Sequence, residues 1–250
     1  MLNIQTILHN YQPITLSKMD EVALMERVDD KYTISYEELK NILDNISNEY
    51  FCLEIDGKRS FSYQTEYLDT SENILFKNHQ NGKLNRYKIR FRDYIESKKT
   101  FLEIKFKSNK GVTKKTRIRI PFQKKNITKI CKEFIESKTP YLTENLSIKV
   151  KNNFERITLV NLVSKERVTL DFNLKFSNPN LGTESKLDNI GIIEIKREKG
   201  NKKSQLLSIL KKERIRPTRF SKYTIGSCLL DSNLKYNNFK KKLLFINKLS

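Results

Sequence analysis

The sequence predicts an α+β protein in which most strands run antiparallel within one sheet. Three observations lead to this fold class. Many segments alternate polar and apolar residues with the period of two that is typical of strands. A few other stretches have the periodicity of amphipathic helices. Consecutive strand segments mostly follow one another as in hairpins, whereas a βαβ protein would place a helix between each pair.

Eight segments show the alternation expected of strands. In RYKIRFR (86–92), for example, the cationic residues alternate with Tyr87, Ile89 and Phe91, so the two sets face opposite sides of a sheet. The eight segments are 27–33, 61–68, 86–92, 101–107, 112–120, 150–160, 167–176 and 191–198.

Helical segments lie between and after these strands. Ser35, followed three residues later by Glu38, forms a capping box that marks the start of a helix over 35–49. The other predicted helices are 71–80, 124–138, 202–213 and a tail from about 219 to 247, with a break at Asn237 and Asn238.

The composition is strongly basic, which indicates either a polyanionic ligand or only a surface rich in Lys and Asn, and charge alone does not decide between them. Lys and Arg number 49 against 29 Asp and Glu, which gives a formal net charge of +20. A field of this sign attracts nucleic acid, acidic membranes and phosphate compounds. Three widely spaced cysteines and two histidines indicate neither a disulfide framework, nor a zinc site, nor His-based catalysis. The N-terminus lacks a signal peptide and no apolar run approaches a membrane span, so we expect a cytoplasmic protein.

The charged strand faces allow two arrangements. They would lie in solvent on an open sheet, or line the interior of a closed sheet as a polyanion-binding channel, and the pattern alone leaves both open. The sequence contains neither GxxxxGK[ST] nor GxGxxG. Any phosphate would therefore be held by Arg and Lys side chains. Carboxylates among these cations would hold Mg²⁺ or Mn²⁺.

A series of short motifs resembles a known family in both content and order. The motifs are RVDDKY (27–32), YLDT (67–70), KIRFR (88–92), FLEIK (101–105), VTKKTR (112–117), FER (154–156), RVTLDFNL (167–174), IIEIK (192–196) and FSKY (220–223). They resemble the catalytic domain of the vacuolar transporter chaperone (VTC) polyphosphate polymerases, within the triphosphate tunnel metalloenzyme superfamily. The resemblance implies a single tunnel domain over 1–250, with a core of about 24–230 and a helical tail of about 231–250. Its eight antiparallel strands would close into a tunnel with a basic interior and helices packed outside.

The resemblance also implies a function and a set of site residues. Such polymerases transfer the terminal phosphate of ATP to a growing polyphosphate chain, with Mn²⁺ or Mg²⁺. Glu194 is the implied metal ligand, and Glu103 is a weaker candidate. Asp29 and Asp171 are implied as supporting carboxylates, Asp171 by orienting Arg167. The implied phosphate contacts are Lys31, Arg90, Arg92, Lys105, Lys115, Arg117, Arg156, Arg167, Lys196 and Lys222, with Ser221 assisting Lys222.

Two departures from the family pattern bear on the reaction. The triphosphatase and adenylate cyclase branch opens with ExExK, whereas this chain has Arg27-x-Asp29-x-Lys31, which fits the polymerase branch and removes one carboxylate. Phe154 stands where the family often has Tyr, so one hydrogen bond to substrate would be missing.

Three hypotheses for the function follow. The first is an ATP-dependent polyphosphate polymerase, the second a hydrolase of inorganic or nucleoside triphosphates, and the third a non-catalytic binder of polyphosphate or nucleic acid. The aromatic residues of 86–92 face away from the charged side, which disfavours nucleic acid because single-strand binders stack bases on aromatics within the basic face. We therefore expect ATP or another triphosphate and polyphosphate as ligands, with a membrane protein as a further partner that accepts the product. The tail 239–248 is expected to be an amphipathic packing helix rather than a membrane-docking one.

Overall fold

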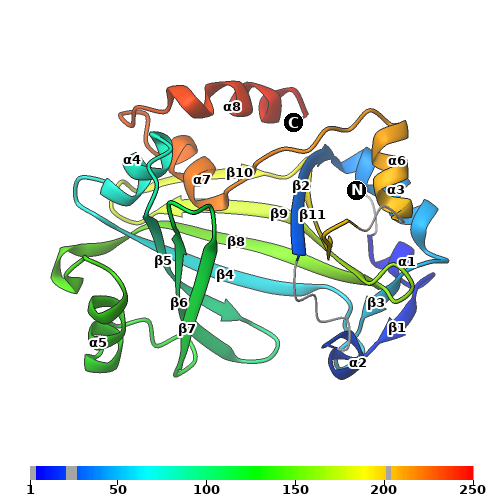
Figure 1. The fold of residues 1–250 in the computed structure, drawn as a ribbon, viewed down its shortest axis with the longest axis horizontal. Helices are drawn as coiled ribbons and strands as arrows, with labels where there is room; N and C mark the ends of the chain where they lie inside the picture. Colours follow the sequence, from blue (N-terminus) through cyan, green and yellow to red (C-terminus); the bar gives the residue numbers. More distant parts are fainter. Residues whose placement is uncertain (1–3, 21–26, 201–203, 250) are drawn as a thin grey trace.

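The computed structural model describes residues 4–20, 27–200 and 204–249, and one large β-sheet forms its centre (Figure 1). All eight predicted segments are strands of this sheet, which confirms the α+β fold class. Their bounds are β2 (Arg27–Ser35), β4 (Phe61–Thr70), β5 (Arg86–Tyr94), β6 (Lys99–Lys107), β7 (Thr113–Ile120), β8 (Leu146–Asn161), β9 (Glu166–Asn178) and β11 (Ile190–Glu198).

These eight strands pair antiparallel in the order β2-β11-β9-β8-β4-β5-β6-β7. Within the described residues no backbone pairing joins β2 to β7, so the two ends of this path are not closed by hydrogen bonds. Three further strands are too short to show a period; one pairs with β8, one with β9, and the third with the short strand next to β8. They are β1 (Gln12–Ile14), β3 (Phe51–Leu53) and β10 (Thr183–Leu187).

Several helices cover the outer face of the sheet. α3 (Tyr36–Ile46) begins at the predicted capping box of Ser35 and Glu38. It packs with α1 (Ile4–Leu8) and α6 (Gln205–Lys212) on outward side chains of β8, β9 and β11. The short helix α2 (Leu16–Asp20) follows β1. α5 (Lys129–Lys138) forms a second apolar cluster with outward residues of β5 and β6.

α7 (Lys222–Leu230) is an exception to the expected outside position, because it packs on the inner face of the sheet. Seven of its nine residues are buried, as in a helix that is covered on all sides. Gly226 permits this close approach: a Cβ there would lie 2.6 Å from Cδ1 of Phe176 and 3.0 Å from Cγ1 of Val150. α7 therefore fills one part of the inner face and leaves the remainder to polar side chains.

The C-terminal segment forms a second helix, α8 (Asn237–Leu249), next to α7 and α4 (Ile74–Gln80). The predicted break at Asn237 and Asn238 is wrong, because the chain leaves helical conformation before them and α8 begins at Asn237. Asn competes for backbone hydrogen bonds and so favours helix starts as well as breaks. Phe239 and Ile246 of α8 are buried in the same cluster as α7. Among the described helices, none is both long and apolar enough to cross a membrane.

Candidate phosphate-binding site

The cations of β5 reach the inner face because of strand parity. Ile89 and Phe91 are buried on the outer face, at 0% and 1% exposure. The alternate residues Lys88, Arg90 and Arg92 therefore point inward. Their nitrogens contact inner-face groups on β4, β6 and α7.

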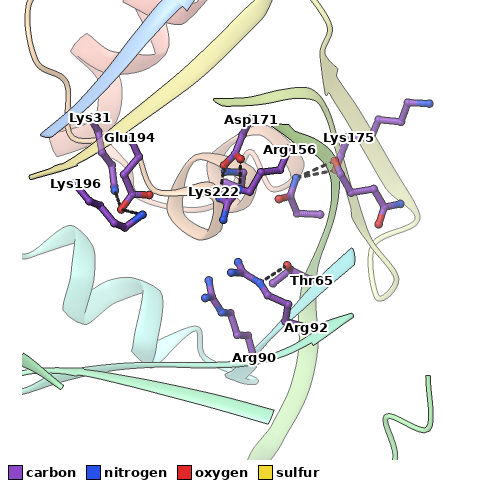
Figure 2. A network of polar contacts seen from close by, with 12 residues as sticks. Lys31, Thr65, Arg90, Arg92, Arg156, Asp171, Lys175, Glu194, Lys196 and Lys222 are labelled. Carbon is purple, nitrogen blue, oxygen red and sulfur yellow. Dashed lines mark hydrogen bonds and ion pairs between the residues drawn. The ribbon is translucent and has the colours of Figure 1, made fainter. Parts of the chain in front are cut away.

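On the opposite side of the interior, Glu194 of β11 lies between two lysines. Its Oε1 is 2.6 Å from Nζ of Lys31, on neighbouring β2, and 3.3 Å from Nζ of Lys196 (Figure 2). Burial alone would raise the pKa of Glu194, but Lys196 and Lys31 outweigh it and hold that pKa well below its usual range. Glu194 is therefore an ionised carboxylate that holds two phosphate-binding candidates together.

Asp171 of β9 binds two cations from different elements (Figure 2). The Arg156 guanidinium on β8 donates from Nε to Oδ1 at 2.5 Å and from Nη2 to Oδ2 at 2.7 Å. Nζ of Lys222, at the start of α7, also donates to Oδ2. Burial would raise the pKa of Asp171, but Arg156 and Lys222 reverse this and hold it well below its usual range.

The predicted pairing of Asp171 with Arg167 is wrong. Arg167 lies four residues away on the same strand, about 13 Å along it, and is opposite Lys196. Arg156 lies directly across from Asp171 on β8. The partner of Asp171 depends on the register between β8 and β9, which the alternation of residues within one strand does not reveal.

Glu103 of β6 is 1% exposed and also joins two cations. Arg90 donates from Nε and Nη2 to its Oε2 at 2.8 and 2.6 Å, and Nζ of Lys115 on β7 is 2.5 Å from its Oε1. Burial opposes ionisation, but Arg90, Arg92 and Lys115 together lower the pKa of Glu103 to about 2.

Arg92 and Lys88 of β5 point inward but make no ion pair with a carboxylate in the described part of the chain. Arg92, 8% exposed, donates from Nε to Oγ1 of Thr65 at 3.3 Å. Nζ of Lys88 donates to Oγ of Ser221 at 2.9 Å. Loss of hydration, and then nearby cations, lower the pKa of both groups, that of Lys88 well below its usual value. Because a desolvated cation without a counter-charge is costly, these two groups favour a bound anion.

Comparisons with known proteins show the family of this chain. The model of the VTC domain family matches residues 26–231, most of the chain. This chain belongs to the VTC domain family. No curated protein matches the sequence significantly.

Two solved structures share the fold of this VTC domain. One is a candidate adenylate cyclase from Bacillus halodurans, with a TM-score of 0.51 and 14% identity over 78% of this chain and 94% of that one. The other is the candidate adenylyl cyclase HpAC1 from Hippeastrum, described as having a dominant triphosphatase activity, with a TM-score of 0.55 and 16% identity over 85% of this chain and 100% of that one. Identities this low show the fold alone. They therefore show that this VTC domain has the same fold as these two proteins.

The VTC domain gathers most of the remaining predicted residues around one cavity. Lys105 and Asp29 line this cavity together with Lys31, Lys88 and Ser221. The Ser221 hydroxyl caps α7 by accepting from the backbone N–H of Thr224. Its hydroxyl also accepts from Lys88, so the structure links Ser221 to Lys88 and not to Lys222.

Arg117 and Arg167 are less closely integrated. The guanidinium of Arg117, on exposed β7, lies 4.5 Å from the ring centroid of Phe101. Arg167 is half-buried on β9. Neither makes an ion pair within the described ranges, so their assignment as phosphate contacts rests on the motif and on strand parity.

Aromatic rings also line the inner wall of the VTC domain. Tyr63 of β4 and Phe154 of β8 stack with their centroids 5.2 Å apart. The guanidinium of Arg156 lies 5.1 Å from the centroid of Tyr63, and Nζ of Lys222 lies 4.3 Å from that of Phe154. The outward orientation of the β5 aromatics therefore does not extend to β4 and β8, but these inward rings are covered by cations. Phe154, where the family often has Tyr, packs beneath Lys222.

The acidic side chains do not form a metal site of their own. In the described residues no group of three or more His, Cys, Asp or Glu side chains could hold a metal ion. Glu103, Asp171 and Glu194 belong to three separate ion-paired clusters. Carboxylate oxygens do suit Mg²⁺ and Mn²⁺, and Mg²⁺ is often held by one or two carboxylates together with substrate phosphates. The residues fit a cation that a triphosphate helps to hold, and Glu194 is the most exposed of the three, at 20% of its side chain.

Two site residues are missing from the sequence-based set. Lys88 shares the parity of Arg90, so the alternation of RYKIRFR was sufficient to indicate it. Thr65 carries no comparable signal, because its contact with Arg92 depends on the register that places the two residues opposite each other on β4 and β5.

Proposed function

We propose that this VTC domain is an ATP-dependent polyphosphate polymerase. A terminal phosphate oxygen of the growing chain attacks the γ-phosphorus of ATP, and the bond from that phosphorus to the β,γ-bridging oxygen breaks. ADP leaves with the electron pair of that bond, and the chain becomes one phosphate longer. The inward Arg and Lys side chains hold both polyanions in line, which is most of what phosphoryl transfer requires of a protein.

The observation that carries the proposal is that the inner carboxylates are ion-paired and ionised. Glu103, Asp171 and Glu194 are each bound to two cations, and the pKa of each lies far below neutral. A carboxylate with so low a pKa is a poor general base for activating water. A terminal phosphate oxygen is already ionised near neutral pH and needs no base, so these surroundings favour a phosphate acceptor over water.

Arg90, Arg92 and Lys88 are the proposed contacts of the triphosphate on β5, and Lys222 and Arg156 are those on the opposite side. Arg92 and Lys88, which make no carboxylate ion pair in the described residues, gain most from a bound phosphate. Charge-assisted hydrogen bonds to the phosphate oxygens then replace the hydrogen bonds to water that these two side chains lose on burial.

A divalent cation, Mn²⁺ or Mg²⁺, is proposed to arrive with the triphosphate and to take Glu194 as its protein ligand. When bound, it supplies neutralisation of the charge that spreads over the phosphate oxygens. Glu103 is less suited to this role, because both of its oxygens are occupied by cations.

A second candidate function is triphosphate hydrolysis. It is favoured by the fold shared with HpAC1, which is described as having a dominant triphosphatase activity. In that case a water molecule would be the acceptor, and one of the paired carboxylates would have to orient it.

The test is to incubate the purified protein with ATP and Mn²⁺ and to separate the products by size. We expect long phosphate chains and ADP, whereas orthophosphate without chains would support the hydrolase.

Glu194→Gln should abolish metal-stimulated turnover but retain metal-free ATP binding. Arg90→Ala should weaken ATP binding, and exposed Arg216→Ala is the matched control. Absence of turnover, with unchanged ATP affinity in Arg90→Ala, would contradict both reactions.

A further inference from the structure

A cavity of about 760 Å³ opens from the site toward α8. One side is formed by β2, through residues 29–31, and the other by the adjacent ends of β5, β6 and β7. The end of α4 with the turn after it (79–82), residues 217–221, which lead into α7, and α8 complete its wall. The cavity therefore joins the inner phosphate site to an outer opening, which we call the mouth.

Four cations from four different segments line the outer part of this cavity. Arg86 lies at the start of β5, Lys107 at the end of β6, Arg219 before α7, and Lys242 on α8. None of the four makes an ion pair with a carboxylate in the described part of the chain. Burial and then Arg219 lower the pKa of both Arg86 and Lys242, which is consistent with these cations lying close together.

Carboxylates in the cavity wall do not neutralise this group. They are confined to β2, where Asp30 binds Arg197 with an Oδ2–Nη2 distance of 3.0 Å. The other is Asp29, whose charge acts on Lys105 and Lys196 deeper in the site. The mouth is therefore a concentration of positive charge.

The mouth and the inner site are continuous along β5. Arg86, Lys88, Arg90 and Arg92 share the inner face, and the first and last of them are about 20 Å apart along an extended strand. Arg86 is fixed at the outer end by a 2.8 Å hydrogen bond from Nη1 to the carbonyl oxygen of Lys83. A triphosphate is shorter than this row of cations, whereas a longer phosphate chain can occupy all of it.

We propose that Arg86, Lys107, Arg219 and Lys242 form a subsite for the part of a polyphosphate chain that extends beyond the triphosphate-binding wall. The inference rests on the proposed polymerase function for its biological role, but its binding test does not require turnover. Lys242 lies outside the 26–231 range of the family match, so this chain's own C-terminal helix contributes to the recognition of long chains. The subsite would keep a growing chain bound between successive transfers.

The test compares two ligands without metal or nucleotide: tripolyphosphate and a long-chain polyphosphate. Arg219→Ala combined with Lys242→Ala removes two charges from the mouth. The matched control combines Lys240→Ala with Lys241→Ala, which removes two exposed charges from the same helix. Calorimetric titration gives both affinities for each protein, and thermal unfolding checks that the fold is retained.

We expect the mouth variant to lose about tenfold in affinity for the long chain, while tripolyphosphate affinity changes little. The control should bind both ligands nearly as the unmodified protein does. Equal losses for the two ligands, no loss for the long chain, or an equal loss in the control would each overturn the subsite. If the variant does not fold, Lys242→Glu alone provides the same comparison.

These experiments give different results when the subsite proposal is wrong and when the polymerase proposal is wrong. A protein that forms no chains from ATP, yet loses long-chain binding selectively in the mouth variant, would refute the polymerase and support the subsite. A polymerase that binds long chains equally well with and without the two mouth cations would refute only the subsite.

Discussion

At the scale of single residues, Arg92 is the side chain whose surroundings most favour an anion. It is 8% exposed, and its polar contacts in the described chain are a 3.3 Å hydrogen bond to Thr65 and a position 5.9 Å from the ring centroid of Tyr63. Neither contact provides a full negative charge. By contrast, the neighbouring Arg90 has Glu103 as a partner, so Glu103 fixes Arg90 in place, while the charge of Arg92 has no carboxylate ion pair in the described residues.

The lysines of the inner wall make anion binding sensitive to pH. Burial lowers the pKa of Lys115 and of Lys222 to about 8, although Glu103 and Asp171 act in the opposite direction. The positive charges of Arg90 and Arg92 near Lys115, and of Arg156 and Arg92 near Lys222, contribute to these lowered values. The protonated forms attract phosphate, so affinity should be highest below pH 8 and fall as the lysines lose their protons.

We therefore expect the affinity for metal-free ATP to fall at least about tenfold between about pH 7 and about pH 9, where the charge of the phosphate itself is nearly constant. Titration calorimetry across this range measures the effect. Lys115→Arg combined with Lys222→Arg keeps the positive charge and should flatten the profile. A double variant with the unmodified profile would show that other groups titrate.

The sequence was sufficient to predict which residues share a face of the sheet, but not which residues pair across neighbouring strands. The alternation in RYKIRFR and GIIEIKRE correctly places Arg90, Arg92, Glu194 and Lys196 on one face. It does not contain the cross-strand register, so it could not show that Asp171 pairs with Arg156 on β8 and not with Arg167 on its own strand. The register arises from the pairing of whole strands, a property that no single segment encodes.

At the scale of secondary-structure elements, α7 connects the stability of the fold with the geometry of the site. Its apolar body packs on inward residues of β8 and β9, while its first turn carries Lys222 to Asp171. The hydroxyl of Tyr223 also donates to the buried carboxylate of Asp69. Asp69 in turn accepts backbone N–H groups of Leu75 and Phe76 at the start of α4. The position of Lys222 therefore depends on contacts far from the phosphate site.

Gly226→Ala tests this dependence. The added Cβ would lie 2.6 Å from Phe176 and 3.0 Å from Val150, so α7 must move or the strands must yield. We expect the free energy of unfolding to fall by about 1–3 kcal/mol, measured by urea denaturation, and ATP affinity to fall with it as Lys222 is displaced. Gly191→Ala is the control on the outer face, where the nearest atom is the flexible tip of Leu39 at 3.1 Å. Unchanged stability and affinity in Gly226→Ala would show that α7 is loosely packed.

The long strands were predictable because each has enough residues to show a period, whereas β1, β3 and β10 have three to five residues and were not. The inner position of α7 was also not predictable. A segment such as KYTIGSCLL is apolar on all sides, which indicates burial but not the face of the sheet on which it is buried.

At the scale of the whole molecule, the two ends of the sheet face each other across the cavity without backbone pairing in the described residues. Lys31 of β2 and Lys105 of β6 are close enough for the charge of one to lower the pKa of the other, although burial has the larger effect. A phosphate chain between them would replace this repulsion with attraction on both sides. Closure was the part of the tunnel prediction that the sequence pattern could not decide, and in the described residues no strand pairing joins β2 to β7.

The net charge of +20 attracts any polyanion, so the selectivity of the cavity must be tested against that general field. Exposed cations are screened beyond about 8 Å at physiological salt, whereas Arg90, Arg92, Arg156 and Lys222 are largely buried on the inner wall. Single-stranded DNA binds mainly through its phosphates, and its affinity falls steeply with salt. We expect excess single-stranded DNA to leave bound tripolyphosphate in place at about 150 mM salt, as measured by competition with a labelled ligand. Stoichiometric displacement by DNA under these conditions would instead identify the inner wall as a general polyanion-binding surface, and the protein as a binder rather than a selective triphosphate enzyme.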